Sequence, residues 1–205
     1  MVKNAVKNVL NIGGIDIAPG ETKKIELEMP PLYMATNMSI PVYVKRGKRP
    51  GPTMFVSAAI HGDELNGIEI VGRLIRSKSI SRIRGTLIAV PMVTVYGVLN
   101  QSRYLPDRRD LNRSFPGSKK GSLAGRVAKI FFDEIVSKCD LGIDLHTGAI
   151  HRSNLPQVRT NIDNEYTFNL AKVFGAPVVL HSQIRDGSLR VVVQEEGVPI
   201  LLYEA

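Results

Sequence analysis

Polar and apolar residues alternate in the first part of the chain, which is the pattern of strands with one exposed face. The alternation runs through residues 22–29 and again through residues 39–44. Glycine and proline pairs at 13–14 and 19–20 are typical of turns between such strands. Residues 1–48 are therefore predicted to form a β-rich N-terminal segment.

A different pattern begins after the Pro-Gly-Pro run at 50–52, where short apolar runs alternate with stretches of helical spacing. The apolar runs predict strands buried on both faces, and the spaced stretches predict amphipathic helices. We expect strands at 53–60, 85–90, 141–145, 177–180 and 199–203, and helices at 64–77, 122–138, 163–174 and 188–196. This alternation predicts an α/β fold over residues 49–205, with three α/β/α layers around a mainly parallel, mixed sheet.

Composition and charge narrow the class of protein. The chain has 205 residues, of which 43% are hydrophobic, and a formal net charge of +8. This length and composition indicate a globular protein with a core and exclude a disordered or collagen-like chain. Because aromatic residues are not interleaved with the scattered basic ones, we expect no nucleic-acid partner, and a few arginines that bind a small anion. The single cysteine, Cys139, is predicted to be a buried thiol.

The sequence also bears on the compartment. Residues 1–10 contain lysines but lack the apolar stretch and small-residue cleavage site of a leader. The most apolar segment, 85–99, is interrupted by Pro91 and is shorter than a membrane span. We therefore expect no membrane partner and a cytoplasmic, reducing compartment.

Side chains that bind metals follow three of the predicted strands. His61 and Glu64 come after the first buried strand, His146 after the third, and Glu204 after the last. The carboxyl ends of parallel strands meet at one edge of a sheet, so these side chains are expected to converge. Two histidines and a carboxylate match a catalytic zinc site with an open position for water. Each residue alone is more often structural, and it is their combination that favours the metal site.

A long polar loop at 97–121 carries further candidates, Arg103, Asn112 and Arg113. An arginine can bind a carboxylate through two hydrogen bonds, and an asparagine can add a third through its amide. The alternative is a charged surface loop without a ligand, which is the usual state of such segments.

These motifs together resemble a known family. They are His61-Gly-Asp-Glu64, Asp110-Leu-Asn-Arg113, Asp144-Leu-His146-Thr-Gly and Leu-Tyr-Glu204. They occur in the order found in the succinylglutamate desuccinylase/aspartoacylase family, whose members are relatives of the zinc carboxypeptidases. The resemblance covers residues 50 to 205 and implies a zinc-carboxypeptidase-like fold.

The resemblance implies a role for each matching residue. His61, Glu64 and His146 would hold one zinc ion per chain, and Glu204 would be the general base that takes a proton from the attacking water. Asn112 and Arg113 would hold the carboxylate of the substrate. Arg103 would stabilise the oxyanion of the tetrahedral intermediate. Arg190 would meet a second anionic group.

Several other polar residues near the motifs have a role that the sequence leaves open. Asp144 lies two residues before His146 and so shares its face of a strand, where it either orients that ring or forms a buried contact beneath the site. His151 and Arg152 belong either to the pocket or to a plain polar loop. His181 ends a predicted strand without a motif around it, and Tyr203 is expected to pack or hydrogen-bond locally.

The resemblance implies a zinc-dependent hydrolase of carbon–nitrogen bonds that cleaves an N-acyl amino acid, a small anionic substrate. Two alternatives stay open. One is a carboxypeptidase-type peptidase, since a C-terminal residue offers the same carboxylate. The other is a metal-binding fragment without turnover, because family members usually continue beyond the position of Glu204. The acyl group, the amino acid, the physiological metal and a homo-oligomeric state are left open by the sequence.

Overall fold

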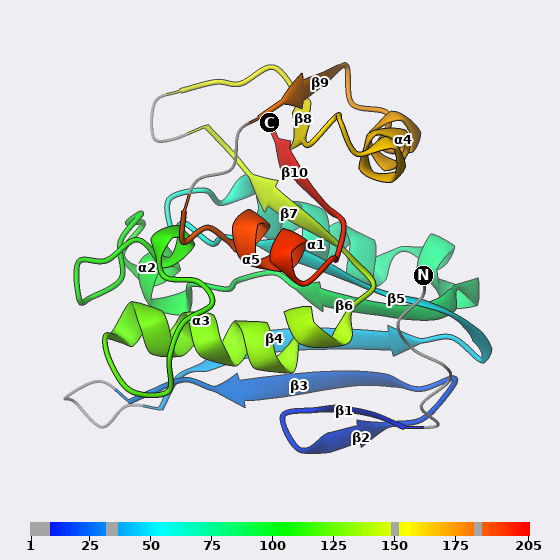
Figure 1. Ribbon diagram of the computed structural model, residues 1–205. Coiled ribbons are helices and arrows are strands. Elements are labelled where there is room, and N and C mark those ends of the chain that lie inside the picture. Colours follow the sequence, from blue (N-terminus) through cyan, green and yellow to red (C-terminus); the bar gives the residue numbers. More distant parts are fainter. Residues whose placement is uncertain (1–8, 32–36, 149–151, 183–185) are drawn as a thin grey trace.

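The computed structural model describes residues 9–31, 37–148, 152–182 and 186–205. Its centre is an eight-stranded mixed sheet of strand order β3-β4-β6-β5-β7-β10-β8-β9 (Figure 1). Parallel pairing joins β6, β5, β7 and β10 in the middle, whereas β4 and β8 join antiparallel on either side. The strands span Thr22–Glu28 (β3), Ser39–Arg46 (β4), Arg49–Ala58 (β5), Arg84–Val90 (β6), Leu141–His146 (β7), Gln157–Thr160 (β8), Val178–His181 (β9) and Ile200–Glu204 (β10).

Helices cover both faces of the sheet, which confirms the predicted α/β/α layering. α3 (Leu123–Glu134) and α5 (Leu189–Glu195) pack on one face, and α1 (Asn66–Arg76) and α4 (Glu165–Phe174) on the other. Successive side chains of a strand point to opposite faces. Phe55 accordingly joins the core beneath α3, and its neighbour Val56 joins the core beneath α1.

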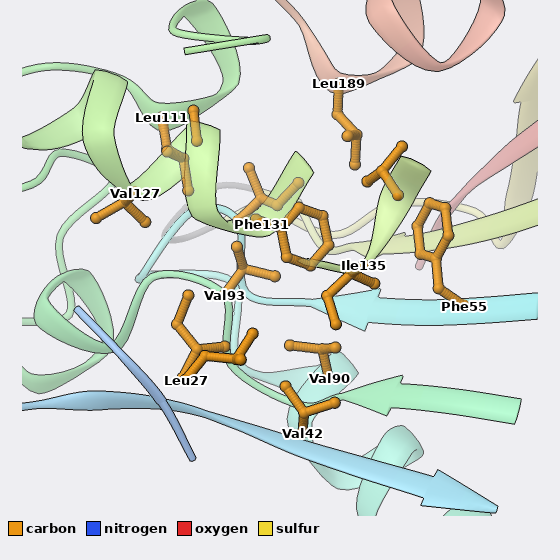
Figure 2. Close-up of a cluster of buried hydrophobic side chains, with 14 of the residues drawn as sticks. Leu27, Val42, Phe55, Val90, Val93, Leu111, Val127, Phe131, Ile135 and Leu189 are labelled. Atoms are coloured by element: carbon orange, nitrogen blue, oxygen red, sulfur yellow. The ribbon is translucent and has the colours of Figure 1, made fainter. Parts of the chain in front are cut away.

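The larger core lies between the sheet and α3. Figure 2 shows Phe131 and Ile135, at the end of α3, against Phe55 of β5 and Val90 of β6. The rings of Phe55 and Phe131 meet edge to face with centroids 6.1 Å apart. Both side chains are fully buried, so each removes apolar area from water at about 25 cal/mol per Å².

The N-terminal segment shares this core. A hairpin of β1 (Leu10–Ile12) and β2 (Ile15–Ile17) precedes β3 and β4, which continue the main sheet. Ile12 and Ile17 are fully buried in the same cluster as Phe131. Residues 1–48 and 49–205 thus contribute to one sheet and one core. Their division into two units stays a prediction.

The element boundaries differ from the predicted ones at several places. β5 begins at Arg49, since an irregular register carries its pairing with β6 past the two prolines. The helix predicted at 122–138 ends at Glu134 and is followed by a 3₁₀ turn at Val136–Lys138. β8 was not predicted, because its four residues, Gln-Val-Arg-Thr, include only one apolar side chain, whereas the equally short β9 is an apolar run. The polar loop contains a 3₁₀ turn at Leu111–Arg113, and a short helix, α2 (Val95–Leu99), ends within it.

Side-chain caps fix the starts of three helices. The Oγ atoms of Ser122 and Ser188 accept hydrogen bonds from backbone N–H groups of α3 and α5, and Asn164 does the same for α4. Such caps satisfy N–H groups that have no partner within the helix. These helices are short, and in the described part of the chain none is both long and apolar enough to cross a membrane.

The parallel strands place their carboxyl ends at one edge of the sheet. In Figure 1 the arrowheads of β7 and β10 point to the same end. Glu204 of β10 is the register partner of His146 of β7, and Leu145 is the partner of Ala58 at the end of β5. The segments that follow β5, β7 and β10 therefore start side by side, and this edge is called the carboxyl edge below.

Candidate metal and substrate site

His61, Glu64 and His146 lie together at the carboxyl edge, with ligand atoms that are all within 4.8 Å of one another. All three side chains are buried. The Glu64 carboxylate lies between the two rings, with Oε1 2.6 Å from Nδ1 of His61 and Oε2 2.7 Å from Nδ1 of His146. Ala59 turns the chain after β5 with a φ of 51°, a strained conformation for a residue other than glycine that is frequent at functional sites.

A second set of groups orients the ring of His146. Its Nε2 lies 2.8 Å from Oδ2 of Asp144, and Oγ of Ser57 donates to Oδ1 of Asp144 at 2.8 Å. Asp144 and Ser57 are register partners on β7 and β5, so backbone pairing fixes this contact. Of the two alternatives for Asp144, the structure therefore shows the first: its carboxylate is the acceptor that fixes the orientation of the His146 ring.

The charges of this cluster are strongly coupled. Burial alone would raise the pKa of Glu64, but hydrogen bonds from His146 and His61 outweigh it and hold the pKa well below its usual range. Burial alone would lower the pKa of His146, but the carboxylates of Asp144 and Glu64 outweigh it and raise the pKa to about 10. Without a metal, the imidazole of His146 is therefore a cation at neutral pH and donates from both nitrogens.

The donor set fits a divalent metal ion. Two imidazole nitrogens and one carboxylate are a common ligand set for zinc at catalytic sites. The Nδ1 atoms of both histidines already face the Glu64 carboxylate, so an ion between them would replace the protons that now join these groups. The bond from Asp144 to the far nitrogen of His146 is the usual second contact of a metal-binding histidine.

Arg103 lies beside this cluster and is fixed by Asp110. Nε and Nη2 of Arg103 donate to Oδ2 of Asp110 at 3.1 and 2.8 Å. Oδ1 of Asp110 lies 3.3 Å from Nε2 of His61. Burial would raise the pKa of Asp110, but His61 and Arg103 outweigh it and hold the pKa well below its usual range. The remaining nitrogen of Arg103, Nη1, lies 3.9 Å from Oε1 of Glu64 and is thus directed at the cluster of His61, Glu64 and His146.

Asn112 and Arg113 lie in the 3₁₀ turn, and Asp110 caps its start. Oδ1 of Asp110 accepts a hydrogen bond from the backbone nitrogen of Asn112 at 2.8 Å. Oδ1 of Asn112 accepts from the backbone nitrogen of Leu189 at 2.9 Å, which ties the turn to the start of α5. Nη1 of Arg113 donates to the backbone carbonyl of Asn112. Both side chains line the same cavity as His61, Glu64 and His146.

Glu204 extends from the end of β10 into that cavity. Nδ2 of Asn154 donates to its Oε1 at 2.8 Å, and Nε of Arg159 forms an ion pair with its Oε2 at 2.8 Å. Both carboxylate oxygens are therefore fixed by neighbours, and the backbone of Glu204 is paired with both β7 and β8.

Arg190, in the first turn of α5, points its guanidinium at Ser182. Its Nη2 donates to the backbone oxygen of Ser182 at 2.9 Å, and its Nη1 donates to Oγ at 3.2 Å. Burial, with a smaller effect from the nearby charge of Arg159, lowers the pKa of Arg190. A guanidinium that is buried beside neutral oxygens is a favourable place for an anionic group of a ligand.

The cavity that contains these residues has a volume of about 380 Å³. All the candidate site residues from the sequence line it: His61, Glu64, Arg103, Asn112, Arg113, His146, Arg190 and Glu204. Two more arginines, Arg152 and Arg159, also line it. The cavity thus has five arginines and only three carboxylates, those of Glu64, Asp144 and Glu204. The excess of guanidinium groups favours an anionic ligand.

Of the other residues considered from the sequence, those that the structure describes lie outside the cavity at the carboxyl edge. His181 is exposed at the end of β9 and is not among the cavity-lining residues. The ring of Tyr203 packs against Phe174 with centroids 5.1 Å apart, and Cys139 is buried with a pKa that burial raises. His151 lies outside the described residues.

Sequence reasoning did not identify Asn154, Arg159 or the role of Asp110. Asp110 stood in a motif, but only the structure shows that it holds Arg103. Asn154 and Arg159 come from a loop and a short strand without a motif around them, so no local pattern indicates that they reach Glu204.

The fold and this edge define a class, the zinc-carboxypeptidase-like α/β proteins with a His/Glu/His cluster at the ends of central strands. A metallo-carboxypeptidase from Burkholderia cenocepacia has the same fold, with a TM-score of 0.68 and 15% identity over 89% of this chain and 55% of that one. Residues 50–205 match the family model of the succinylglutamate desuccinylase/aspartoacylase catalytic domain. The chain belongs to this family.

Relatives in the family can be compared along their length. The chain is 33% identical over 148 residues to the N-alpha-acetyl-L-2,4-diaminobutyric acid deacetylase of Halomonas elongata, which covers 69% of this chain and 43% of that protein. The product-bound ectoine utilization protein of Ruegeria pomeroyi has a TM-score of 0.81 and 27% identity, covering 89% of this chain and 59% of that one. An aspartoacylase family protein of Mesorhizobium loti has a TM-score of 0.81 and 26% identity, covering 92% of this chain and 62% of that one. This chain spans less than two thirds of the length of these relatives.

Proposed function

We propose that the protein is a zinc-dependent amidohydrolase that cleaves the acyl group from a small N-acyl amino acid. The observation that carries the proposal is the buried cluster of His61, Glu64 and His146 inside a cavity with an excess of arginine. Membership in a family of deacylases supports it. So does the similarity to a deacetylase named for an N-acetylated amino acid.

In this proposal, Asn112 and Arg113 bind the carboxylate of the amino-acid part. The amide oxygen of Asn112 is already occupied by the backbone of Leu189, which leaves its NH₂ group to face the ligand. Arg113 adds a charged donor from the next position of the same turn. Because the turn is capped by Asp110 and tied to α5, these two donors are held before the substrate arrives, which lowers the entropic cost of binding.

A zinc ion held by His61, Glu64 and His146 would act as a Lewis acid and make water a nucleophile near neutral pH. Glu204 is the proposed general base, which removes a proton from the attacking water and returns it to the leaving amine. Its contacts with Asn154 and Arg159 hold the carboxylate in one orientation. Such fixation matters because proton transfer requires the base within hydrogen-bond reach of the water.

Arg103 is the proposed donor to the oxyanion. Asp110 binds two of its nitrogens and leaves Nη1 directed toward the metal-binding cluster, where the carbonyl oxygen of the scissile amide would lie. A preorganised charged donor stabilises the tetrahedral intermediate more than the ground state. Arg190 is proposed to meet a second anionic group, on the acyl chain or on the amino-acid side chain.

The test combines metal analysis with a substrate panel. Elemental analysis is expected to find about one zinc per chain in the wild type and little in His146→Ala. The panel compares N-acetyl and N-succinyl derivatives of aspartate, glutamate and 2,4-diaminobutyrate with blocked dipeptides. Release of a free amine from the N-acyl amino acids, lost in His146→Ala and Glu204→Gln, supports the proposal.

Other outcomes have distinct meanings. Cleavage of the dipeptides alone would assign a peptidase. Zinc uptake without any hydrolysis would assign a metal-binding fragment. Hydrolysis that is unchanged in Glu64→Ala and His146→Ala would contradict a metal-dependent reaction altogether.

A further inference from the structure

A second cavity lies at the opposite end of the sheet from the metal-binding cluster. It has a volume of about 710 Å³, which exceeds that of the cavity at the carboxyl edge. Its walls come from the end of β4, the starts of β5 and β6, the first strand of the N-terminal hairpin and the 3₁₀ turn after α3. None of the residues proposed for hydrolysis lines it, so the proposed reaction does not account for it.

The charged side chains along this cavity all have the same sign. The described residues that line it include five cations and no Asp or Glu: Arg46, Lys48, Arg49, Arg84 and Lys138. Lys138 is neutralised by Glu134 at 2.6 Å. In contrast, Lys48, Arg49 and Arg84 form no ion pair within the described part of the chain.

Two of these cations are cross-strand neighbours. Arg49 and Arg84 are register partners at the starts of β5 and β6, and both line the cavity. Like charges at paired positions of a sheet repel each other, and no carboxylate relieves the repulsion here. Two guanidinium groups at neighbouring positions can, however, chelate one oxyanion through several charge-assisted hydrogen bonds.

The rest of the wall is apolar or backbone. Val9, Leu10, Pro19, Pro50 and Pro52 supply apolar surface. Gly51 and Gly85 bring the backbones of the two strands together, since a Cβ on Gly51 would lie 2.8 Å from the backbone nitrogen of Gly85. A ligand that fits this wall has an apolar body as well as an anionic group, and free phosphate alone leaves the apolar part unused.

We propose that this cavity is a second ligand site, which binds a small molecule that carries an oxyanion, phosphoryl or carboxylate, on an apolar body. Arg49 and Arg84 bind the oxyanion together, with Lys48 beside them, and the prolines and Leu10 contact the body. The proposal does not depend on the hydrolytic activity, because the two cavities share no lining residue.

The test measures binding of phenyl phosphate, benzoate and inorganic phosphate to the full chain by calorimetry. Phenyl phosphate and benzoate present the two oxyanions on the same ring, so comparing them shows which group the site prefers. Phenyl phosphate is expected to bind at least about tenfold more tightly than inorganic phosphate. Arg49→Gln and Arg84→Gln are each expected to weaken phenyl phosphate binding by at least about tenfold.

Two matched variants control for charge and for the other cavity. Arg73→Gln removes an exposed guanidinium of α1 that pairs with Glu69, and Arg113→Gln removes one from the cavity at the carboxyl edge. Both are expected to keep phenyl phosphate binding within about twofold of wild type, since Arg73 is an exposed charge away from either cavity and Arg113 lines only the other cavity. Arg84→Gln is also expected not to lower the unfolding temperature in phosphate-free buffer, because it removes a repulsion, and this separates lost binding from lost folding.

Three results would overturn the proposal. One is the absence of binding of all three compounds to the wild-type chain. Another is unchanged binding of phenyl phosphate in Arg49→Gln and Arg84→Gln. The third is binding that Arg113→Gln abolishes, which would place the anion at the carboxyl edge instead.

Discussion

The imidazole of His146 has a carboxylate at each of its nitrogens, and this arrangement predicts how metal-free stability depends on pH. The raised pKa stabilises the folded state fully below pH 6.5, the ordinary value for histidine, and this contribution is lost as the pH rises toward about 10. The free energy of unfolding of metal-free wild type and His146→Gln should be compared by urea denaturation. The stability advantage of the wild type is expected to shrink between about pH 6 and about pH 10. A gap that is constant with pH would contradict the assigned contacts.

The ion pair between Arg159 and Glu204 predicts a loss of turnover without a loss of metal. In Arg159→Gln, the carboxylate of the proposed base keeps only its contact with Asn154. Because a displacement of about 1 Å can cost about a hundredfold in rate, we expect kcat to fall by about ten- to a hundredfold. The zinc content is expected to stay at the wild-type level and KM to change by less than kcat.

Arg108→Gln is a matched control for this variant, because Arg108 is not among the residues that line the cavity. It is expected to leave kcat and zinc content unchanged. A loss of zinc in Arg159→Gln would instead show that this arginine supports the fold around the metal site, and an unchanged kcat would remove its proposed role at Glu204.

At the scale of elements, the loop after β5 must pass very close to α2. A Cβ on Gly62 would lie 1.9 Å from the carbonyl carbon of Gly97, and backbone on both sides prevents an easy adjustment. Gly62→Ala is therefore expected to displace the segment that carries His61, lowering stability by about 1–3 kcal/mol and weakening zinc binding. Thermal unfolding and competitive chelation of zinc measure the two effects.

The control for this loop is another glycine in a different environment. At Gly72 in α1, a Cβ would meet only the flexible end of Arg76, at 3.3 Å. Gly72→Ala is expected to be neutral or to stabilise by up to about 1 kcal/mol, since alanine favours helix. Equal effects of the two substitutions would mean that the loop after β5 is not held by its contact with α2.

The elements that the sequence predicted well are those with a strong hydrophobic pattern, either a helical period or a continuous apolar run. Runs such as 53–60 are nearly continuously apolar, which predicts central parallel strands, and these strands place His61, His146 and Glu204 at the carboxyl edge. Side chains that act through distant partners could not be predicted in this way. Arg159 reaches Glu204 only because β8 pairs antiparallel with β10, a choice that depends on the whole sheet and not on four local residues.

At the scale of the whole molecule, the N-terminal hairpin and α3 share one core. Phe131 is fully buried against Phe55 and Phe115, with ring centroids 6.1 and 6.3 Å away. Phe131→Ala is expected to lower the free energy of unfolding by about 3–5 kcal/mol through lost burial and a cavity. Urea denaturation monitored by circular dichroism measures this change.

The same core predicts a single unfolding transition for the N-terminal segment and the rest. The backbone nitrogen of Gly13 donates to Glu134 at 2.8 Å, and Lys138 donates to the backbone oxygen of Asn11 at 2.9 Å. Hydrogen exchange is expected to show amides of β3 and β5 opening with one free energy. A separate, earlier opening of β3 would support residues 1–48 as an independent unit.

The pairing of β5 with β7 has a further consequence, for the order of events during folding. Glu64 and His146 are 82 residues apart in sequence, and only the β5–β7 ladder brings them into contact. Closing such a long loop costs conformational entropy, and the pairing of the strands must offset this cost. Only then are all three proposed ligands close enough to bind one cation. Metal capture by the proposed site is therefore expected late in refolding, as a report on completion of the central ladder, and nascent chains released before residue 146 would lack the site.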